Sequence, residues 1–117
     1  MDMQERTQGA VVLIDVSGRL VAGDDSGQIK DKINSLIFQG RRQIVLNLAG
    51  VSYIDSTGLG ELAAAHATVA RKGGQIVLVA LTARVQDLLA ITRLLTVFDV
   101  FDTEAEALAT LAPLTGA

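Results

Sequence analysis

The amino-acid sequence predicts an α/β fold: a single domain over residues 1–117, with a mixed, mostly parallel sheet of four to five strands and about four helices. Three observations lead to this prediction. The length of 117 residues suits one domain. Short apolar runs alternate with longer segments of helical periodicity, a pattern typical of parallel sheets with crossover helices. The apolar runs are almost uninterrupted, as in strands that are covered on both faces.

The first predicted elements are a strand and a helix. Residues 10–16 favour a strand because most of their side chains are β-branched, and residues 6–8 can pair with it across a tight glycine turn. Residues 25–39 favour a helix that Asp25 can cap and Gly40 can close. Its apolar side chains follow one helical stripe, formed by Ile29, Ile33, Leu36 and Ile37.

The rest of the chain continues the alternation. Strands are predicted at residues 44–48, 76–80 and 97–101, and helices at residues 58–72, 82–92 and from Thr103 onward. Thr103 and Glu106 have the spacing of a capping box. The resulting order, β-β-α-β-α-β-α-β-α, implies a largely parallel sheet with right-handed crossovers. Phe98 and Phe101 are assigned to the core by default. The alternative is that one of them contacts a second copy of the chain in a weak homodimer.

Composition excludes several classes of function. The chain has no cysteine and one histidine, which rules out a disulfide framework, a thiolate nucleophile and a multi-histidine metal centre. A net charge of −3 and the scarcity of aromatic residues argue against direct nucleic-acid binding. The longest apolar run has six residues, Ile76 to Leu81, whereas a membrane span needs about 20. Because residues 1–5 do not resemble a signal peptide, we expect a soluble, cytoplasmic protein without membrane insertion.

One segment, residues 51–60, differs from this regular scaffold. A short apolar stretch leads into an acidic residue, two hydroxyl residues and two glycines, in the order Asp55, Ser56, Thr57, Gly58, Leu59 and Gly60. Asp, Ser and Thr are all preferred at a helix start, where free backbone N–H groups and the helix dipole favour an anion. A serine hydroxyl at such a position is exposed and can carry a phosphate without disrupting the helix.

Two other interpretations compete with a functional one. A serine or aspartate before a helix usually serves only as its cap, but capping does not explain two glycines, which weaken a helix by roughly 1 kcal/mol each relative to Ala. Glycines there would let the backbone of another protein approach closely. Residues 58–63 also fit G-x-G-x-x-A, a variant of the dinucleotide-binding fingerprint. The residues between it and the preceding strong strand, and the lack of a ribose-binding acid, disfavour nucleotide binding.

No catalytic pair is apparent, so we expect a protein that is not an enzyme and that uses no cofactor or metal. Ser56 and His66 are ten residues apart on or near one helix. They would be separated by about 15 Å, whereas a nucleophile and its base must lie about 3 Å apart. His66 is assigned instead to a partly buried structural position. Asp24 and Asp25 could suggest metal ligands, but loop and capping roles are commoner for such residues.

The hexapeptide from Asp55 to Gly60, preceded by residues 51–54, resembles the signature of bacterial anti-sigma factor antagonists of the STAS-domain family. The similarity extends over nearly the whole chain and implies a STAS-like domain. Residues 17–20 resemble the glycine-containing turn after the second strand of the family, and residues 44–48 resemble its central strand. Gly73–Gly74 precedes the next strand, as in the family.

The resemblance implies a specific function. Family members bind an anti-sigma factor that is also a serine kinase, and so free a sigma factor. The kinase phosphorylates a serine at the start of this helix, which inactivates the antagonist, and a serine phosphatase reverses the reaction. Ser56 matches the phosphorylated serine, whereas Thr57 matches a neighbouring hydroxyl position that is not the usual acceptor.

The resemblance also implies where the partner binds. It points to contacts along residues 55–60 and, in the loop after residue 20, at Asp24. The alternative is a constitutive STAS interaction module of a signalling or transport complex, without regulation by phosphorylation.

Overall fold

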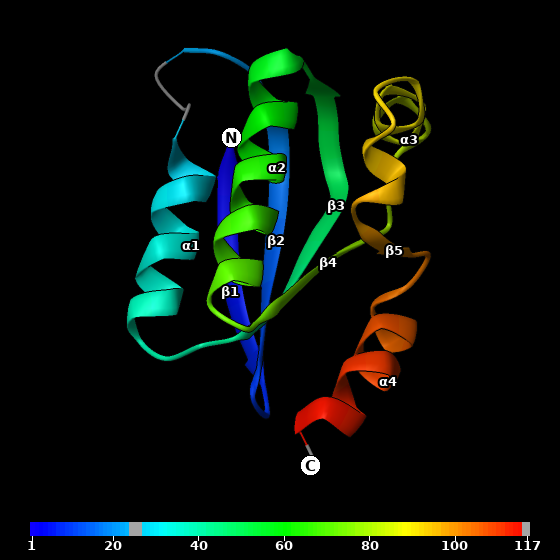
Figure 1. Ribbon diagram of the computed structural model, residues 1–117. Helices are drawn as coiled ribbons and strands as arrows, with labels where there is room; N and C mark the ends of the chain where they lie inside the picture. Colours follow the sequence, from blue (N-terminus) through cyan, green and yellow to red (C-terminus); the bar gives the residue numbers. More distant parts are fainter. Residues whose placement is uncertain (24–26, 116–117) are drawn as a thin grey trace.

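The computed structural model describes residues 1–23 and 27–115, with the backbone alone for residues 112–115. Its elements, in chain order, are β1 (Asp2–Gln8), β2 (Val11–Leu20), α1 (Gln28–Phe38), β3 (Gln43–Ile54), α2 (Ser56–Arg71), β4 (Gln75–Val79), α3 (Ala83–Ile91), the 3₁₀ helix η1 (Leu94–Thr96), β5 (Asp99–Phe101) and α4 (Glu104–Thr115). The predicted alternation of strands and helices is confirmed (Figure 1). The short helix η1 was not predicted.

Five strands form one sheet in the order β1-β2-β3-β4-β5. Strand β1 is antiparallel to β2, from the pair Asp2↔Ser17 to the pair Gln8↔Val11. Strands β2, β3, β4 and β5 run parallel to one another. Each parallel connection contains a helix, as crossover connections require. The predicted fold class, a mixed and mostly parallel α/β sheet, is therefore confirmed.

The central strands separate two apolar cores. Val12 and Ile14 of β2 face the larger core, which α1, α2 and α3 cover. Val11 and Leu13 face the opposite way and pack in the smaller core with Leu111 of α4. Figure 1 shows α1 and α2 side by side across one face of the sheet. Both faces of the central strands are thus covered, as the uninterrupted apolar runs predict.

Strands β2 and β3 are longer than predicted. Strand β3 has 12 residues and continues through Gly50, although the sequence suggested an end near residue 48. Residues 17–20, which were expected to form a turn, belong to β2. The pairing of the two strands shifts register twice along this stretch, so the ladder continues past residues that look like a break. Gly50 allows the strands to meet, because a Cβ there would lie 2.8 Å from the Cβ of Ser17.

Helix α1 begins later than predicted and ends where it was expected to. Its first flanking residue is Gly27; Asp25, the predicted cap, lies outside the described residues. At its other end, Gly40 has a positive φ of 86°, and its N–H donates to the carbonyl of Ile37 at 3.0 Å. Gly40 therefore closes the helix, as predicted.

The caps predicted for α3 and α4 are confirmed. Thr82 Oγ1 accepts a hydrogen bond from the N–H of Val85 at the start of α3. Thr103 Oγ1 accepts from the N–H of Glu106 at 3.2 Å, and Glu106 Oε1 accepts from the N–H of Thr103 at 3.2 Å. This reciprocal pair is a capping box.

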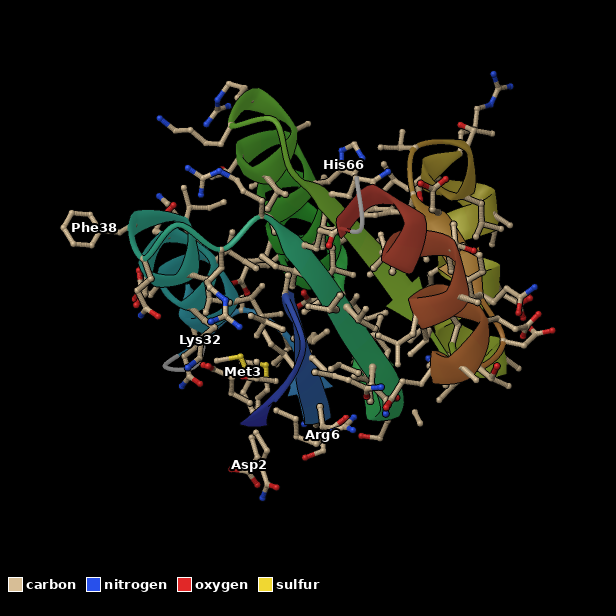
Figure 2. The ribbon with its side chains drawn as sticks, turned by 90° about the horizontal axis from the view of Figure 1, so that it is seen from below. Asp2, Met3, Arg6, Lys32, Phe38 and His66 are labelled. Atoms are coloured by element: carbon tan, nitrogen blue, oxygen red, sulfur yellow. The ribbon has the colours of Figure 1, made fainter. Side chains whose placement is uncertain are left out.

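Phe98 is 4% exposed and lies in the larger core, so its assignment to the core is confirmed. Of the large apolar side chains that the structure describes, Phe38 at the end of α1 is the most exposed, at 93%, and it points away from the molecule (Figure 2). Among the described residues, no helix combines the length and hydropathy that crossing a membrane would require.

Three charged side chains connect β1, β2 and α4. The Arg6 guanidinium donates two hydrogen bonds of 2.8 Å to the Asp15 carboxylate and bonds of 3.0 and 2.7 Å to the Glu104 carboxylate. Asn47 Nδ2 adds a 3.0 Å bond to Asp15. The hydrogen bonds from Arg6 are the main reason that the pKa values of Asp15 and Glu104 lie below their ordinary values.

We predict that Arg6→Gln lowers the free energy of unfolding at pH 7 by about 1 kcal/mol, since the network is partly solvated. Carboxyl groups with a lowered pKa in the folded state stabilise it above their ordinary pKa, and this contribution disappears as the pH falls through the lowered value. The difference between wild type and variant should therefore shrink below about pH 4. Urea titrations across this range measure it, and a difference that stays constant would contradict the assignment.

Candidate functional site at the start of helix α2

Asp55 connects the end of β3 to the start of α2. Its backbone is extended, with φ −114° and ψ −173°, and its N–H donates to the carbonyl of Leu20, the last residue of β2, at 3.1 Å. Its carboxylate accepts the N–H of Gly58 on Oδ1 and the N–H of Ala22 on Oδ2, each at 3.0 Å. Asp55 therefore caps α2 and also fixes the chain that leaves β2.

The same hydrogen bonds keep the Asp55 carboxyl group ionised. The N–H of Gly58, and after it the N–H of Ala22, hold the pKa of Asp55 below its ordinary value, because both donate to the charged form. A negative charge thus lies one residue before Ser56 at neutral pH. The amino end of a 16-residue helix faces this charge and favours anions nearby.

Ser56 and Thr57 are the first residues of α2, and both are exposed. Neither hydroxyl is hydrogen-bonded to any residue that the structure describes. The predicted exposure of Ser56 at a helix start is confirmed. Since Asp55 caps the helix, the Ser56 hydroxyl is free of a structural role there and is accessible to another molecule.

The two glycines of the hexapeptide have different surroundings. A Cβ at Gly58 would clash with the carbonyl oxygen of Leu20 and lie 2.8 Å from Ile54 Cγ1, whereas a Cβ at Gly60 would meet nothing within 4 Å. The sequence suggested that both glycines admit the backbone of another protein. At Gly58 the close approach is internal, where α2 crosses the end of β2.

The predicted contact residues are therefore not equally accessible. Gly58 is buried, and Leu59 is 7% exposed and belongs to the larger core. Ser56, Thr57 and Gly60 are exposed, with Asp55 partly exposed beside them. Asp24 lies outside the described residues. The structure thus brings together an exposed group of three residues and a partly exposed carboxylate at the start of α2.

Glu61 is a site residue that the sequence did not indicate. Its Oε1 accepts the N–H of Gly27, which flanks α1, at 2.6 Å. Asp55 meanwhile holds Ala22. Two carboxylates of one helix start therefore attach the chain on both sides of residues 24–26. No sequence motif marks this role, because it depends on α1 and α2 lying side by side.

Tyr53, which precedes Asp55 by two residues, lies between two arginines, and the sequence did not indicate this arrangement. The guanidinium carbons of Arg19 and Arg84 lie 5.4 and 4.9 Å from the centre of the Tyr53 ring, within the range of cation–π attraction. Arg19 and Tyr53 are paired across β2 and β3. The pairing of Arg19 with Tyr53 could have been inferred by aligning the two strands. Arg84 lies in α3, and no sequence spacing relates it to Tyr53.

His66 takes the structural position that the sequence predicted. It is partly buried, and its ring meets the ring of Phe98 edge-on with centroids 5.3 Å apart. It lies ten residues beyond Ser56 on the same helix, which corresponds to about 15 Å. It cannot act as a base for the Ser56 hydroxyl.

We predict opposite effects for alanine at the two glycines. Gly58→Ala should lower the free energy of unfolding by about 2 kcal/mol, because the added methyl group overpacks the junction with Leu20. Gly60→Ala, the matched control, should raise it by about 1 kcal/mol through helix propensity alone. Thermal and urea denaturation measure both effects. Equal stability of the two variants would mean that α2 does not rest on the end of β2.

The sequence model of the STAS domain matches residues 2–107. A protein from Thermotoga maritima, described as a candidate anti-sigma factor antagonist, is similar in structure, with a TM-score of 0.87 and 24% identity over 94% of each chain. The phosphorylated form of SpoIIAA, a Bacillus cell fate determinant, is similar with a TM-score of 0.73 and 24% identity, over 94% of this chain and 99% of that one.

The same fold also occurs inside a larger protein. The mouse anion transporter solute carrier 26 family member A9 gives a TM-score of 0.75 and 20% identity over 92% of this chain, but over only 18% of the transporter. At such identities the likeness to solved structures establishes the fold. The family match spans most of the sequence, including the hexapeptide at the start of α2, and the chain therefore belongs to the STAS domain family.

Proposed function

We propose that this protein is an anti-sigma factor antagonist, a non-enzymatic regulator that binds an anti-sigma factor with serine-kinase activity and is switched off by phosphorylation of Ser56. The observation that carries the proposal is the exposure of Ser56, the first residue of α2, whose hydroxyl makes no hydrogen bond to any described residue. A serine phosphatase restores the binding form, and both reactions take place in the cytoplasm.

The similarity in fold to known proteins supports this proposal. The chain has the STAS domain that SpoIIAA of Bacillus also has, and SpoIIAA exists in a phosphorylated form. The contact surface consists of the exposed residues Ser56, Thr57 and Gly60 together with the Asp55 carboxylate. Asp24, a predicted contact, remains a proposed member of this surface.

The charge at the site explains how a phosphate would act. A phosphoserine adds about −1.5 to −2 charges at neutral pH. The helix start stabilises an anion by about 0.3 to 1 kcal/mol, but Asp55 is already ionised next to it, so the two effects largely cancel within the domain. At an interface, an unpaired desolvated charge costs several kcal/mol. Phosphorylation therefore acts on partner binding far more than on folding.

The alternative function is a constitutive interaction module without phosphorylation. The likeness to a mouse anion transporter supports this alternative, because the same fold there forms part of a much longer chain. The two functions differ in one observable, the chemical state of Ser56 after exposure to a kinase.

We predict that incubation with ATP and the anti-sigma factor kinase of the same organism adds one phosphate to this chain. Mass spectrometry should locate it on Ser56. Ser56→Ala should abolish the incorporation, while Thr57→Ala, which removes the neighbouring exposed hydroxyl, should leave it unchanged. Absence of phosphate on the wild-type chain would favour the constitutive module. Phosphate on Thr57 would contradict the assignment of Ser56 as the acceptor.

We predict that Ser56→Asp weakens binding to the same kinase at least about tenfold relative to Ser56→Ala, since 1.4 kcal/mol corresponds to a factor of ten. The free energies of unfolding of the two variants should agree within about 1 kcal/mol, because the charge is exposed at a helix start. Calorimetric titration and urea denaturation give the two values. Equal affinities would contradict a charge-operated switch, and a large loss of stability would place the effect in the fold.

A further inference from the structure

Three side chains meet near the carboxyl ends of β2 and β3 and form a group that we call the Tyr53 cluster. Arg19 lies opposite Tyr53 in the pairing of the two strands, and Arg84 is the second residue of α3. Their guanidinium carbons lie 5.4 and 4.9 Å from the centre of the Tyr53 ring. Figure 1 shows the end of β3 beside the start of α2, so the cluster lies at the same end of the molecule as Ser56.

The cluster faces away from the core that α2 covers. The next residues along the two strands, Leu20 and Ile54, are paired with each other and buried in the larger core. Because successive side chains of a strand point to opposite faces, Arg19 and Tyr53 point to the other face of the sheet. Tyr53 belongs to neither apolar core, and both arginines of the cluster are exposed. Packing of the domain therefore does not account for this group.

The two guanidinium groups are held in place but not neutralised. Neither Arg19 nor Arg84 makes a hydrogen bond or an ion pair with any residue that the structure describes. Arg6, in contrast, contacts the carboxylates of Asp15 and Glu104. Attraction to the face of the Tyr53 ring positions a guanidinium and leaves its N–H groups free. Two pre-positioned fork-shaped donors are thus available, and carboxylates are their best-matched partners.

The two sides of this end of the molecule carry opposite charges. At the start of α2, the carboxylates of Asp55 and Glu61 hold the N–H groups of Ala22 and Gly27. Around Tyr53, the charges are positive. The carboxylates disfavour a uniformly anionic partner such as a nucleic acid, because it would approach both sides at once. Opposite patches favour a protein surface with the inverse arrangement, which fixes its orientation and accelerates its association.

We propose that the Tyr53 cluster is a second contact surface for the anti-sigma factor kinase and binds acidic side chains of that kinase. The inference rests on the proposed function and specifies the chemistry of the partner. Aspartate or glutamate carboxylates of the kinase pair with the guanidinium groups of Arg19 and Arg84, while the Tyr53 ring supplies apolar contact between them. Tyrosine and arginine are enriched among the residues that dominate binding at protein interfaces.

The two contact surfaces affect different rate constants. Exposed charges at the rim of an interface mainly change the association rate and its dependence on salt. A charge placed where the partner covers it mainly changes the dissociation rate. The Tyr53 cluster should therefore control how fast the kinase binds, whereas the charge state of Ser56 controls how long it stays bound.

The first test measures association of the full chain with the kinase by stopped-flow at low and high salt. The double variant Arg19→Glu/Arg84→Glu should associate at least about tenfold more slowly at 50 mM salt, and the difference should shrink at 500 mM as screening increases. Arg19→Lys/Arg84→Lys, which keeps both charges, should retain most of the rate. Arg71→Glu, at the far end of α2, is exposed and tests for a general effect of charge reversal at a single site.

The second test uses the composition of the chain. Tyr53 is the only tyrosine, so a chain labelled with ¹³C-tyrosine gives ring signals from this site alone. Unlabelled kinase should shift these signals in the wild type. Arg19→Gln/Arg84→Gln removes the charges without adding repulsion and should weaken the shift in the same titration. Urea denaturation of every variant checks that it is folded.

The results that would overturn the inference differ from those that would overturn the proposed function. Tyrosine signals that stay unchanged in the kinase complex, or equal association rates for Arg19→Glu/Arg84→Glu and Arg71→Glu, would exclude the second contact surface while binding at Ser56 stands. An equal shift with ATP alone would assign the cluster to a small anion instead of a protein. A wild-type chain that does not bind the kinase at all would contradict both proposals.

Discussion

The carboxylate of Asp55 is the constraint on which the candidate site depends. It caps α2 through Gly58 and holds Ala22, while its own N–H is bound to Leu20. Three chain segments, the end of β2, the end of β3 and the start of α2, are thereby joined within a few ångströms. Because Gly58 has no side chain, α2 can pack directly against the backbone of Leu20. With the cap provided by Asp55 and the packing by Gly58, Ser56 is left as a residue that the fold does not use, and its hydroxyl faces solvent.

Much of this architecture is predictable because apolar periodicity is a local property. The strands, the helices and the caps at Thr82 and Thr103 follow from spacing within a few residues. The sequence-based predictions fail where the structure depends on contacts between segments that are far apart in the sequence. Gly50 resembles a break in the sequence, yet it is a point where β3 approaches Ser17 of β2, so β3 continues. The internal contact of Gly58 and the bond from Gly27 to Glu61 could not be predicted for the same reason. Each requires knowing which segments become neighbours.

The two ends of the sheet differ in chemistry. At the carboxyl ends of β2 and β3, carboxylates hold backbone N–H groups and leave hydroxyl groups exposed. At the amino ends, glycine turns and two arginines line an open cleft. Helix α2 connects the two regions. Opposite surfaces of one small domain can therefore serve different partners, because a rigid helix and a parallel sheet separate them.

The strand order has a consequence for the kind of partner that the Ser56 end accepts. Strands β2 to β5 lie in the sheet in their chain order, and α1, α2 and α3 all contribute to the same core. In doubly wound sheets, the crevice for a nucleotide opens where successive connections leave in opposite directions. Here the winding of β2 to β5 never reverses, so the carboxyl edge has no switch point of this kind. An edge of this shape suits broad contact with a macromolecular surface better than enclosure of a small molecule.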